Sequence, residues 1–165
     1  MVRRLSAIAL LSALISAASL AQTRTPSDAA ILAGKWTYRS YLNSPALVDR
    51  DKDKALAIIF GEGTYAFDPP SGAAITGTLD LGGGRVLDLK GSITQTAPLS
   101  LAIAGYGRAG TPTAGWEYDY NASLAYEWPS GIDQRPALVG SVIRAKPHGS
   151  GPAGAVASFI AVKQP

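Results

Sequence analysis

The sequence predicts an all-β fold, a single antiparallel up-and-down β-barrel of about eight strands with a short N-terminal helical turn. Short runs rich in Tyr, Val, Ile, Thr and Leu follow one another, separated by Gly, Pro and Asp. Several of these runs alternate apolar with polar residues, as half-buried strands do. The strands do not alternate with helices, which argues against an α/β fold, and closure into a barrel removes exposed sheet edges. A β-sandwich is the alternative.

Composition supports one globular domain. The chain has 165 residues, of which 47% are hydrophobic and 16% are charged, and this balance excludes a disordered polypeptide. It has no Cys, which excludes disulfides and Cys-based zinc sites, and its single His excludes sites with two His ligands. The Lys and Arg residues are scattered, so no nucleic-acid-binding face is predicted.

The first 21 residues have the composition of a Sec-type signal peptide. The basic pair Arg3 and Arg4 precedes an uncharged apolar run over 5–20, and small residues predict cleavage after Ala21. The run is shorter than a membrane-spanning helix and rich in Ser and Ala, so no membrane insertion is expected. Removal of residues 1–21 lowers the formal net charge of +3 by two, and a periplasmic or secreted location is predicted.

The remaining chain divides into a short segment and the barrel domain. In residues 22–33, Ser27 is predicted to cap one or two helical turns that Gly34 ends. The barrel domain spans 34–165, with strands expected at 34–42, 55–60, 63–68, 73–81, 85–94, 99–107, 116–126, 137–146 and 155–163.

The connections carry turn residues. Glycines predict tight hairpins at 61–63 and 82–84, because glycine tolerates the positive φ of such turns, and residues 68–72 form a turn by composition. The Gly/Pro-rich stretch 147–154 is a further loop. Three longer loops are expected to form the entrance to the barrel, at 43–54, 108–115 and 127–136. In the last of these loops, Trp128 and Pro129 are expected to act as a lid.

An aromatic stripe marks one predicted strand. Its aromatic residues fall on one face, and Glu117 and Asp119 fall on the other. The stripe either lines a cavity or packs the core; if it faced outward, the two carboxylates would line the barrel instead. The sequence alone leaves both orientations open. The candidate ligand-binding residues are Tyr38, Trp116, Tyr118, Tyr120, Tyr126 and Trp128.

Three short motifs resemble those of the calycin barrels, the lipocalin and avidin group. Gly34-Lys35-Trp36 follows a helical turn and is similar to their Gly-x-Trp start, and Tyr118-Asp119-Tyr120 resembles a later Thr-Asp-Tyr motif. The stretch 142–147, the third of them, resembles the lipocalin motif with a late arginine. Separately from these three, 157–163 is similar to the closing strand of avidin-type barrels. The resemblance implies a barrel that binds small molecules in its cavity. It also implies that Gly34 and Trp36 close one end of the barrel and that Arg144 packs over the Trp36 indole.

The candidates for proton transfer are Glu117, Asp119 and His148. His148 precedes Gly149 and Ser150, but a hydrolytic triad also needs an oriented acid and an oxyanion hole, and no Gly-x-Ser-x-Gly elbow is present. A lone His in such a loop is typically solvated; gating of the barrel mouth and general-base catalysis are the alternatives. No catalytic residue is assigned.

The sequence favours a binding protein that takes a small hydrophobic or amphipathic ligand in the barrel. The alternatives are an isomerase-type or cyclase-type barrel enzyme, which rests on fold analogy, and a structural envelope protein with a filled barrel. An apolar cavity of about 300–1,000 Å³ would favour binding, a cavity that holds an ionisable group with a shifted pKa would favour catalysis, and a core filled by side chains would favour the structural protein. Neither a cofactor nor a metal is expected. The expected partner is a small molecule and not nucleic acid, and the sequence leaves open whether the chain forms a homo-oligomer.

Overall fold

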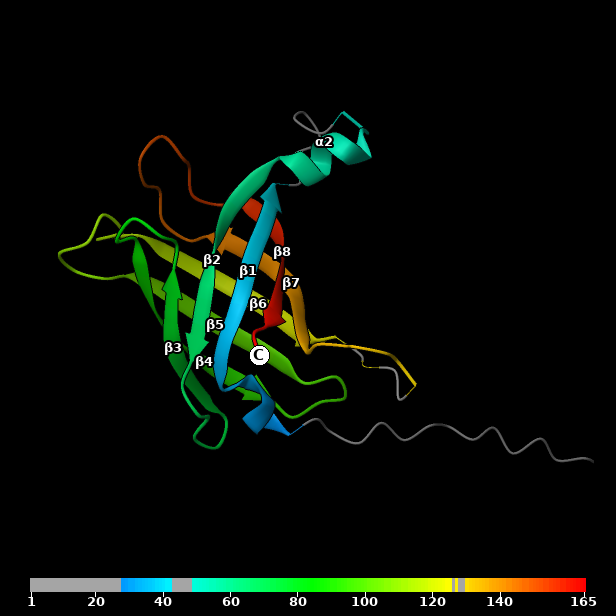
Figure 1. Ribbon diagram of the computed structural model, residues 1–165. Helices are drawn as coiled ribbons and strands as arrows, with labels where there is room; N and C mark the ends of the chain where they lie inside the picture. Colours follow the sequence, from blue (N-terminus) through cyan, green and yellow to red (C-terminus); the bar gives the residue numbers. More distant parts are fainter. Residues whose placement is uncertain (1–27, 43–48, 126, 128–129) are drawn as a thin grey trace, which may run out of the picture.

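The computed structural model describes residues 28–42, 49–125, 127 and 130–165, and eight antiparallel strands close into a barrel. Each strand pairs with the next in sequence, and β1 closes the ring by pairing with β8 (Figure 1). The predicted up-and-down barrel is confirmed, and the β-sandwich alternative is wrong. The strands are β1 (Gly34–Leu42), β2 (Ile59–Phe67), β3 (Ala74–Asp80), β4 (Val86–Thr94), β5 (Ser100–Gly107), β6 (Glu117–Leu124), β7 (Ala137–Arg144) and β8 (Val156–Lys163).

A single 3₁₀ turn, η1 (Ala29–Leu32), precedes the barrel. Its N-cap is Asp28, whose side chain accepts a hydrogen bond from the Ala30 amide. The predicted cap Ser27 lies outside the described residues, as do the predicted signal peptide and its cleavage site. Gly34 directly follows the C-cap of this turn, Ala33, and opens β1, with a φ of +107° that favours glycine.

The region expected to hold a strand, a hairpin and a second strand is folded differently. Helix α2 (Lys52–Ala57) begins after Asp51, whose carboxylate accepts hydrogen bonds from two amides of the first turn, and Lys and Ala are good helix formers. Strand β2 then runs unbroken through the glycines of the predicted 61–63 hairpin, so that hairpin is wrong. Gly61 and Gly63 occupy inward-facing positions of this strand and place no side chain in the lumen. The turn at 82–84 is confirmed, since all three glycines have positive φ.

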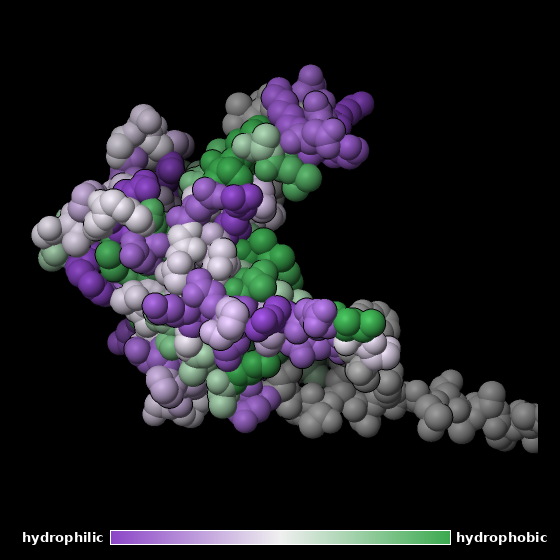
Figure 2. Space-filling model, in the orientation of Figure 1, coloured by the Kyte–Doolittle hydropathy of each residue, from purple (hydrophilic) through white to green (hydrophobic). Residues whose placement is uncertain are grey.

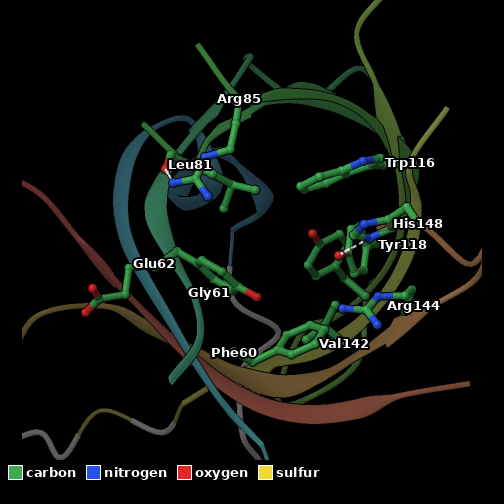
Figure 3. Close-up of a pocket in the computed structure, with 12 residues that line it drawn as sticks. Phe60, Gly61, Glu62, Leu81, Arg85, Trp116, Tyr118, Val142, Arg144 and His148 are labelled. Atoms are coloured by element: carbon green, nitrogen blue, oxygen red, sulfur yellow. Dashed lines mark hydrogen bonds between the residues drawn. The ribbon is translucent and has the colours of Figure 1, made fainter. Parts of the chain in front are cut away.

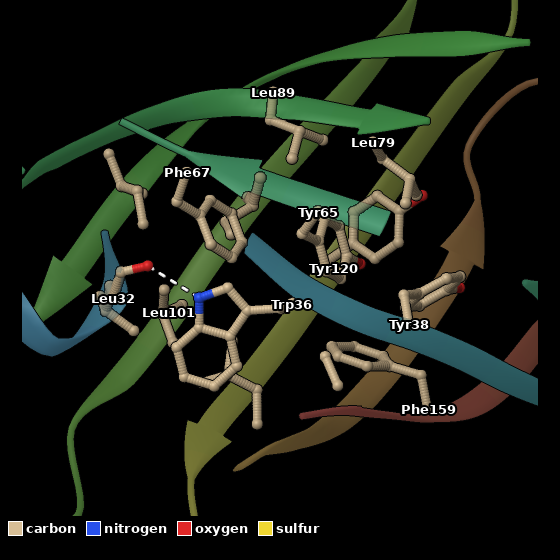
Figure 4. Packing of buried hydrophobic residues seen from close by; sticks show 14 of the residues in the cluster. Leu32, Trp36, Tyr38, Tyr65, Phe67, Leu79, Leu89, Leu101, Tyr120 and Phe159 are labelled. Atoms are coloured by element: carbon tan, nitrogen blue, oxygen red, sulfur yellow. Dashed lines mark hydrogen bonds between the residues drawn. The ribbon is translucent and has the colours of Figure 1, made fainter. Parts of the chain in front are cut away.

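Hydrophobic side chains from alternate strand positions fill the lower barrel (Figure 4). Trp36 is fully buried, and its indole Nε1 donates a hydrogen bond of 2.8 Å to the Leu32 carbonyl of η1. The cation above the indole is Lys163, whose Nζ lies 5.8 Å from the ring centroid and donates to the Ile31 carbonyl at 2.7 Å. Gly34 and Trp36 thus lie at this closed end, but Arg144 does not.

A second layer of rings fills the middle of the barrel. Tyr38 contacts Tyr65 edge-to-face at a centroid distance of 4.9 Å, and Phe159 lies 5.5 Å from Tyr38. Tyr65 stacks on Phe67 at 5.1 Å, and Tyr120 lies 5.9 Å from Tyr65. Among the described residues, these side chains occupy the middle of the lumen.

The topology determines which connections meet at each end. Residues 81–85, 108–116 and 145–155 join strands at the end opposite Trp36, together with the described residues 49–58. The connection between β6 and β7 leaves and re-enters the barrel at the closed end, as Figure 1 shows for its described residues. The expectation that 127–136 borders the entrance is therefore wrong, and Trp128 and Pro129 lie outside the described residues.

The outer surface is uneven in polarity. Figure 2 shows hydrophilic residues over α2 and a hydrophobic patch where Figure 1 places β8. Val139, Val156 and Ile160 are exposed on the outer faces of β7 and β8. Among the described residues, no helix is long and apolar enough to span a bilayer. The oligomeric state stays a prediction.

Candidate ligand-binding site at the barrel mouth

A cavity of about 170 Å³ lies at the mouth of the barrel, above the aromatic layer (Figure 3). Its floor includes Tyr38 from β1 and Tyr120 from β6, both buried. Burial raises the pKa of both phenols, so they are neutral hydroxyl groups near neutral pH. The walls come from β2, the β3–β4 turn, the start of β6, the end of β7 and the loop 145–155.

A β-bulge shapes the wall on the β2 side. Ser40 pairs with Gly61 and Tyr41 pairs with Ile59, so Phe60 is an extra residue opposite this pair. The bulge turns the Phe60 ring into the mouth, where it meets Tyr118 edge-to-face at a centroid distance of 6.1 Å. Gly61 lies beside it at an inward position and, lacking a side chain, leaves part of the cavity empty.

The loop after β7 carries His148 into the mouth. The backbones of His148 and Gly151 exchange two hydrogen bonds, which fold the loop into a short hairpin. The imidazole stacks on Trp116 with centroids 3.9 Å apart and planes 13° apart. Its Nε2 lies 2.5 Å from the Tyr118 hydroxyl, a hydrogen bond whose direction depends on the tautomer. Burial, and then the charge of Arg144, lower the pKa of His148, which is therefore neutral at neutral pH.

Arg144, at the end of β7, lines the same cavity from the opposite side to Arg85 (Figure 3). Its Cζ lies 5.3 Å above the centroid of the Phe60 ring, a cation–π contact. Its Nη1 donates to the Pro152 carbonyl at 3.3 Å, whereas its Nε is buried and has no hydrogen-bond partner. The expected contact with Trp36 is wrong because β7 runs away from the closed end, which brings its last residue to the mouth.

Two further charged residues border the cavity, and both are engaged elsewhere. Arg85 donates to the carbonyls of Gly82 and Leu81 within its own turn, at 3.1 and 2.8 Å. Glu62 points away from the cavity in Figure 3 and forms an ion pair with Arg39 on the outer surface. The mouth therefore combines aromatic walls with cationic groups and no free carboxylate among the described lining residues.

The structure brings together four of the six residues predicted to bind ligand. Tyr38, Trp116, Tyr118 and Tyr120 all line the cavity, while Tyr126 and Trp128 lie outside the described residues, and those two assignments stay predictions. The buried Tyr118 and Tyr120 answer the open question of orientation, because the aromatic stripe faces inward.

The three candidates for proton transfer separate. Asp119 is exposed on the outer face, and Glu117 forms an ion pair with Lys146 there, so neither carboxylate enters the lumen. His148 is the only one of the three in the mouth, which favours the gating or base interpretations over a solvated loop residue. Phe60, Arg85 and the mouth position of Arg144 were missed. No sequence pattern marks the bulge that turns Phe60 inward. The position of Arg144, in contrast, follows from the direction of β7, which ends at the mouth.

The barrel is compatible with a calycin-like fold. Comparison with protein-family models, with curated proteins and with solved structures finds no match for the chain.

Proposed function

We propose that this chain is an exported calycin-like barrel that binds one small, flat, amphipathic molecule in the cavity at its mouth. The observation that carries the proposal is a cavity walled by Phe60, Trp116 and Tyr118 and placed above a filled barrel. Ring faces supply contact area, while the hydroxyl, imidazole and guanidinium groups beside them orient a ligand.

The size of the cavity narrows the class of ligand. Its volume of about 170 Å³ is below the range of about 300–1,000 Å³ expected of a pocket for a drug-sized ligand, so that expectation is not met and the proposal is restricted to smaller molecules. The filled middle layer gives a long acyl chain no room below the floor. A molecule built on a single ring therefore fits the proposal better than a lipid.

Two alternatives receive less support. A barrel enzyme would depend on His148 and Tyr118, because the two carboxylate candidates are on the outer face. The filled middle of the barrel fits a purely structural protein, but such a protein would have little reason to keep an arginine Nε buried without a partner beside an open cavity.

Export is part of the proposal and rests on the composition of residues 1–21. The intact mass of the protein recovered from the periplasm or the medium is expected to match a chain that begins at Gln22. Recovery of the full-length chain from the cytoplasm alone would contradict this part.

The binding experiment uses three probes of one shape, benzoate, benzamide and benzamidine, which differ in charge. At least one is expected to bind saturably and to shift the NMR signals of the Trp116 indole and the His148 ring, but not those of Trp36. Gly61→Leu should abolish the shifts, because a side chain at this position occupies the cavity.

Thr64→Leu is the matched control, since it places the same residue, leucine, on the outer face of the same strand, away from the cavity. It should bind like the wild type. The proposal fails if none of the three probes binds, or if Gly61→Leu folds and binds as the wild type does.

A further inference from the structure

We infer that the mouth cavity selects small organic anions, with the carboxylate or an equivalent oxyanion bound by the Arg144 guanidinium and the ring held by Phe60, Tyr118 and Trp116. This inference rests on the proposed function and deepens it, because it specifies the charge of the ligand and the residue that recognises it.

The first argument is the charge balance of the lining. Arg144 and Arg85 reach the cavity from opposite walls. Glu62, the acidic residue among the described lining residues, is paired with Arg39 on the outer surface. Of the carboxylates near the start of β6, Glu117 is paired with Lys146 and Asp119 is exposed on the outer face. An anion in the mouth would therefore meet positive charge that no described carboxylate in the cavity neutralises.

The second argument is the unused hydrogen-bonding capacity of Arg144. A guanidinium carries five N–H donors in a planar fork that suits two carboxylate oxygens. In this chain one of its nitrogens donates to a carbonyl, that of Pro152, and Nε is buried without a partner. Buried donors in native proteins are normally satisfied, so an orphan beside a cavity indicates a missing acceptor.

The third argument is the way in which the guanidinium is held. Phe60 supports its face at 5.3 Å, and the loop hairpin passes close behind it at Gly151. A Cβ atom at residue 151 would lie 1.7 Å from Nη1, so the glycine makes room for the arginine at this position. The guanidinium is therefore oriented before any ligand arrives, which reduces the entropy lost on binding.

Arg85 serves as the internal comparison. It also borders the cavity, but its Nε and Nη2 are already bonded to the carbonyls of its own turn. We therefore assign anion recognition to Arg144 and a structural role in the β3–β4 turn to Arg85. The two arginines make opposite predictions when each is replaced by methionine, which keeps most of the apolar stem of the side chain and removes the charged guanidinium.

The experiment measures the dissociation constants of benzoate, benzamide and benzamidine by NMR titration. Wild-type protein is expected to bind benzoate at least about tenfold more tightly than benzamide, a difference of about 1.4 kcal/mol, and benzamidine more weakly still. Arg144→Met should remove the preference for benzoate over benzamide, while benzamide binding stays within about twofold of the wild type. Arg85→Met should retain the preference.

A second readout reports where the anion binds. Benzoate beside Arg144 should raise the pKa of His148, because a nearby negative charge favours the imidazolium, and benzamide should leave it unchanged. If Arg144→Met does not fold, Arg144→Lys keeps the charge, loses the fork and should give an intermediate preference.

The possible outcomes separate the two proposals. Equal binding of all three probes at the mouth overturns anion selection and leaves the proposed function standing. Loss of the preference in Arg85→Met but not in Arg144→Met overturns the assignment to Arg144. If no probe binds, the proposed function fails, and the inference that depends on it fails too.

Discussion

The two ends of the barrel each hold a tryptophan and a cation, and they use them in opposite ways. At the closed end, Trp36 is fully buried, its N–H donates to Leu32, and the Lys163 ammonium above it donates to Ile31. At the mouth, Trp116 is half-buried against His148, and Arg144 keeps a buried Nε without a partner. The same two kinds of side chain close one end and leave binding capacity at the other.

The difference lies in the hydrogen bonds. At the closed end η1 folds back over the barrel, so its carbonyls accept from both nitrogen groups. At the mouth the loop 145–155 supplies one carbonyl to the guanidinium and leaves the space in front of it open. Satisfied polar groups favour a single packed arrangement, whereas unsatisfied groups beside a cavity are typical of functional sites.

The largest effect is expected from replacing the two tryptophans. Trp36→Ala should lower the free energy of unfolding by about 3–5 kcal/mol, because it leaves a cavity under Lys163 and η1. Trp116→Ala should lower it by about 1 kcal/mol, since it removes a stacking contact at a half-buried position. Urea denaturation of both variants measures the difference. Similar losses would mean that the two ends are equally packed.

An intermediate effect is expected from two tyrosines. Tyr118→Phe removes the hydrogen bond to His148 and should cost about 0.5–1.5 kcal/mol of unfolding free energy. Tyr65→Phe removes a buried hydroxyl that has no partner, so it should be neutral or stabilise the fold by up to about 1 kcal/mol. The same denaturation measurements apply. A marked loss in Tyr65→Phe would indicate that this hydroxyl does find an acceptor.

The smallest effect is the pH dependence that His148 confers. Its pKa is lowered by burial and by Arg144, the charged group that faces it, so the unfolded chain takes up the proton more readily. The stabilisation should be complete above the unfolded pKa of about 6.5 and should decrease as the pH falls through the folded pKa.

His148→Gln should flatten that part of the stability profile. The single histidine of the chain makes its titration directly visible by proton NMR. A folded-state pKa at or above that of an unfolded reference peptide would contradict the half-buried position of the imidazole beside Arg144.

The barrel itself was predictable because its signals are local. Alternating apolar and polar residues mark β3 and β6, and the glycines at 82–84 mark the turn between β3 and β4. The failure at 52–67 has a specific cause. Asp51 caps a helix that competes with the expected strand, and inward-facing glycines in β2 resemble turn residues when only the sequence is read.

The mouth was predictable in part. The inward stripe on β6 supplied Tyr118 and Tyr120, and Trp116 just before the strand continues it, because one strand face stays together whatever the topology. Arg144 was assigned to the wrong end, since the resemblance did not include the direction of β7. The contact of Phe60 with Arg144 was not predictable, because it depends on a bulge in the pairing of β1 with β2. Such a register shift is a property of the strand pair and not of either strand alone.

Because of the bulge beside Phe60, the sequence of the mouth can change independently of the sequence of the barrel body. Below it, odd-numbered residues of β2 such as Tyr65 face the lumen, whereas above it Phe60 does and Ile59 is exposed. The two parts of the strand are therefore in opposite phase. Substitutions at residues 60 and 61 would alter the shape of the mouth while leaving the inward set below unchanged, so new specificities could arise on an intact barrel.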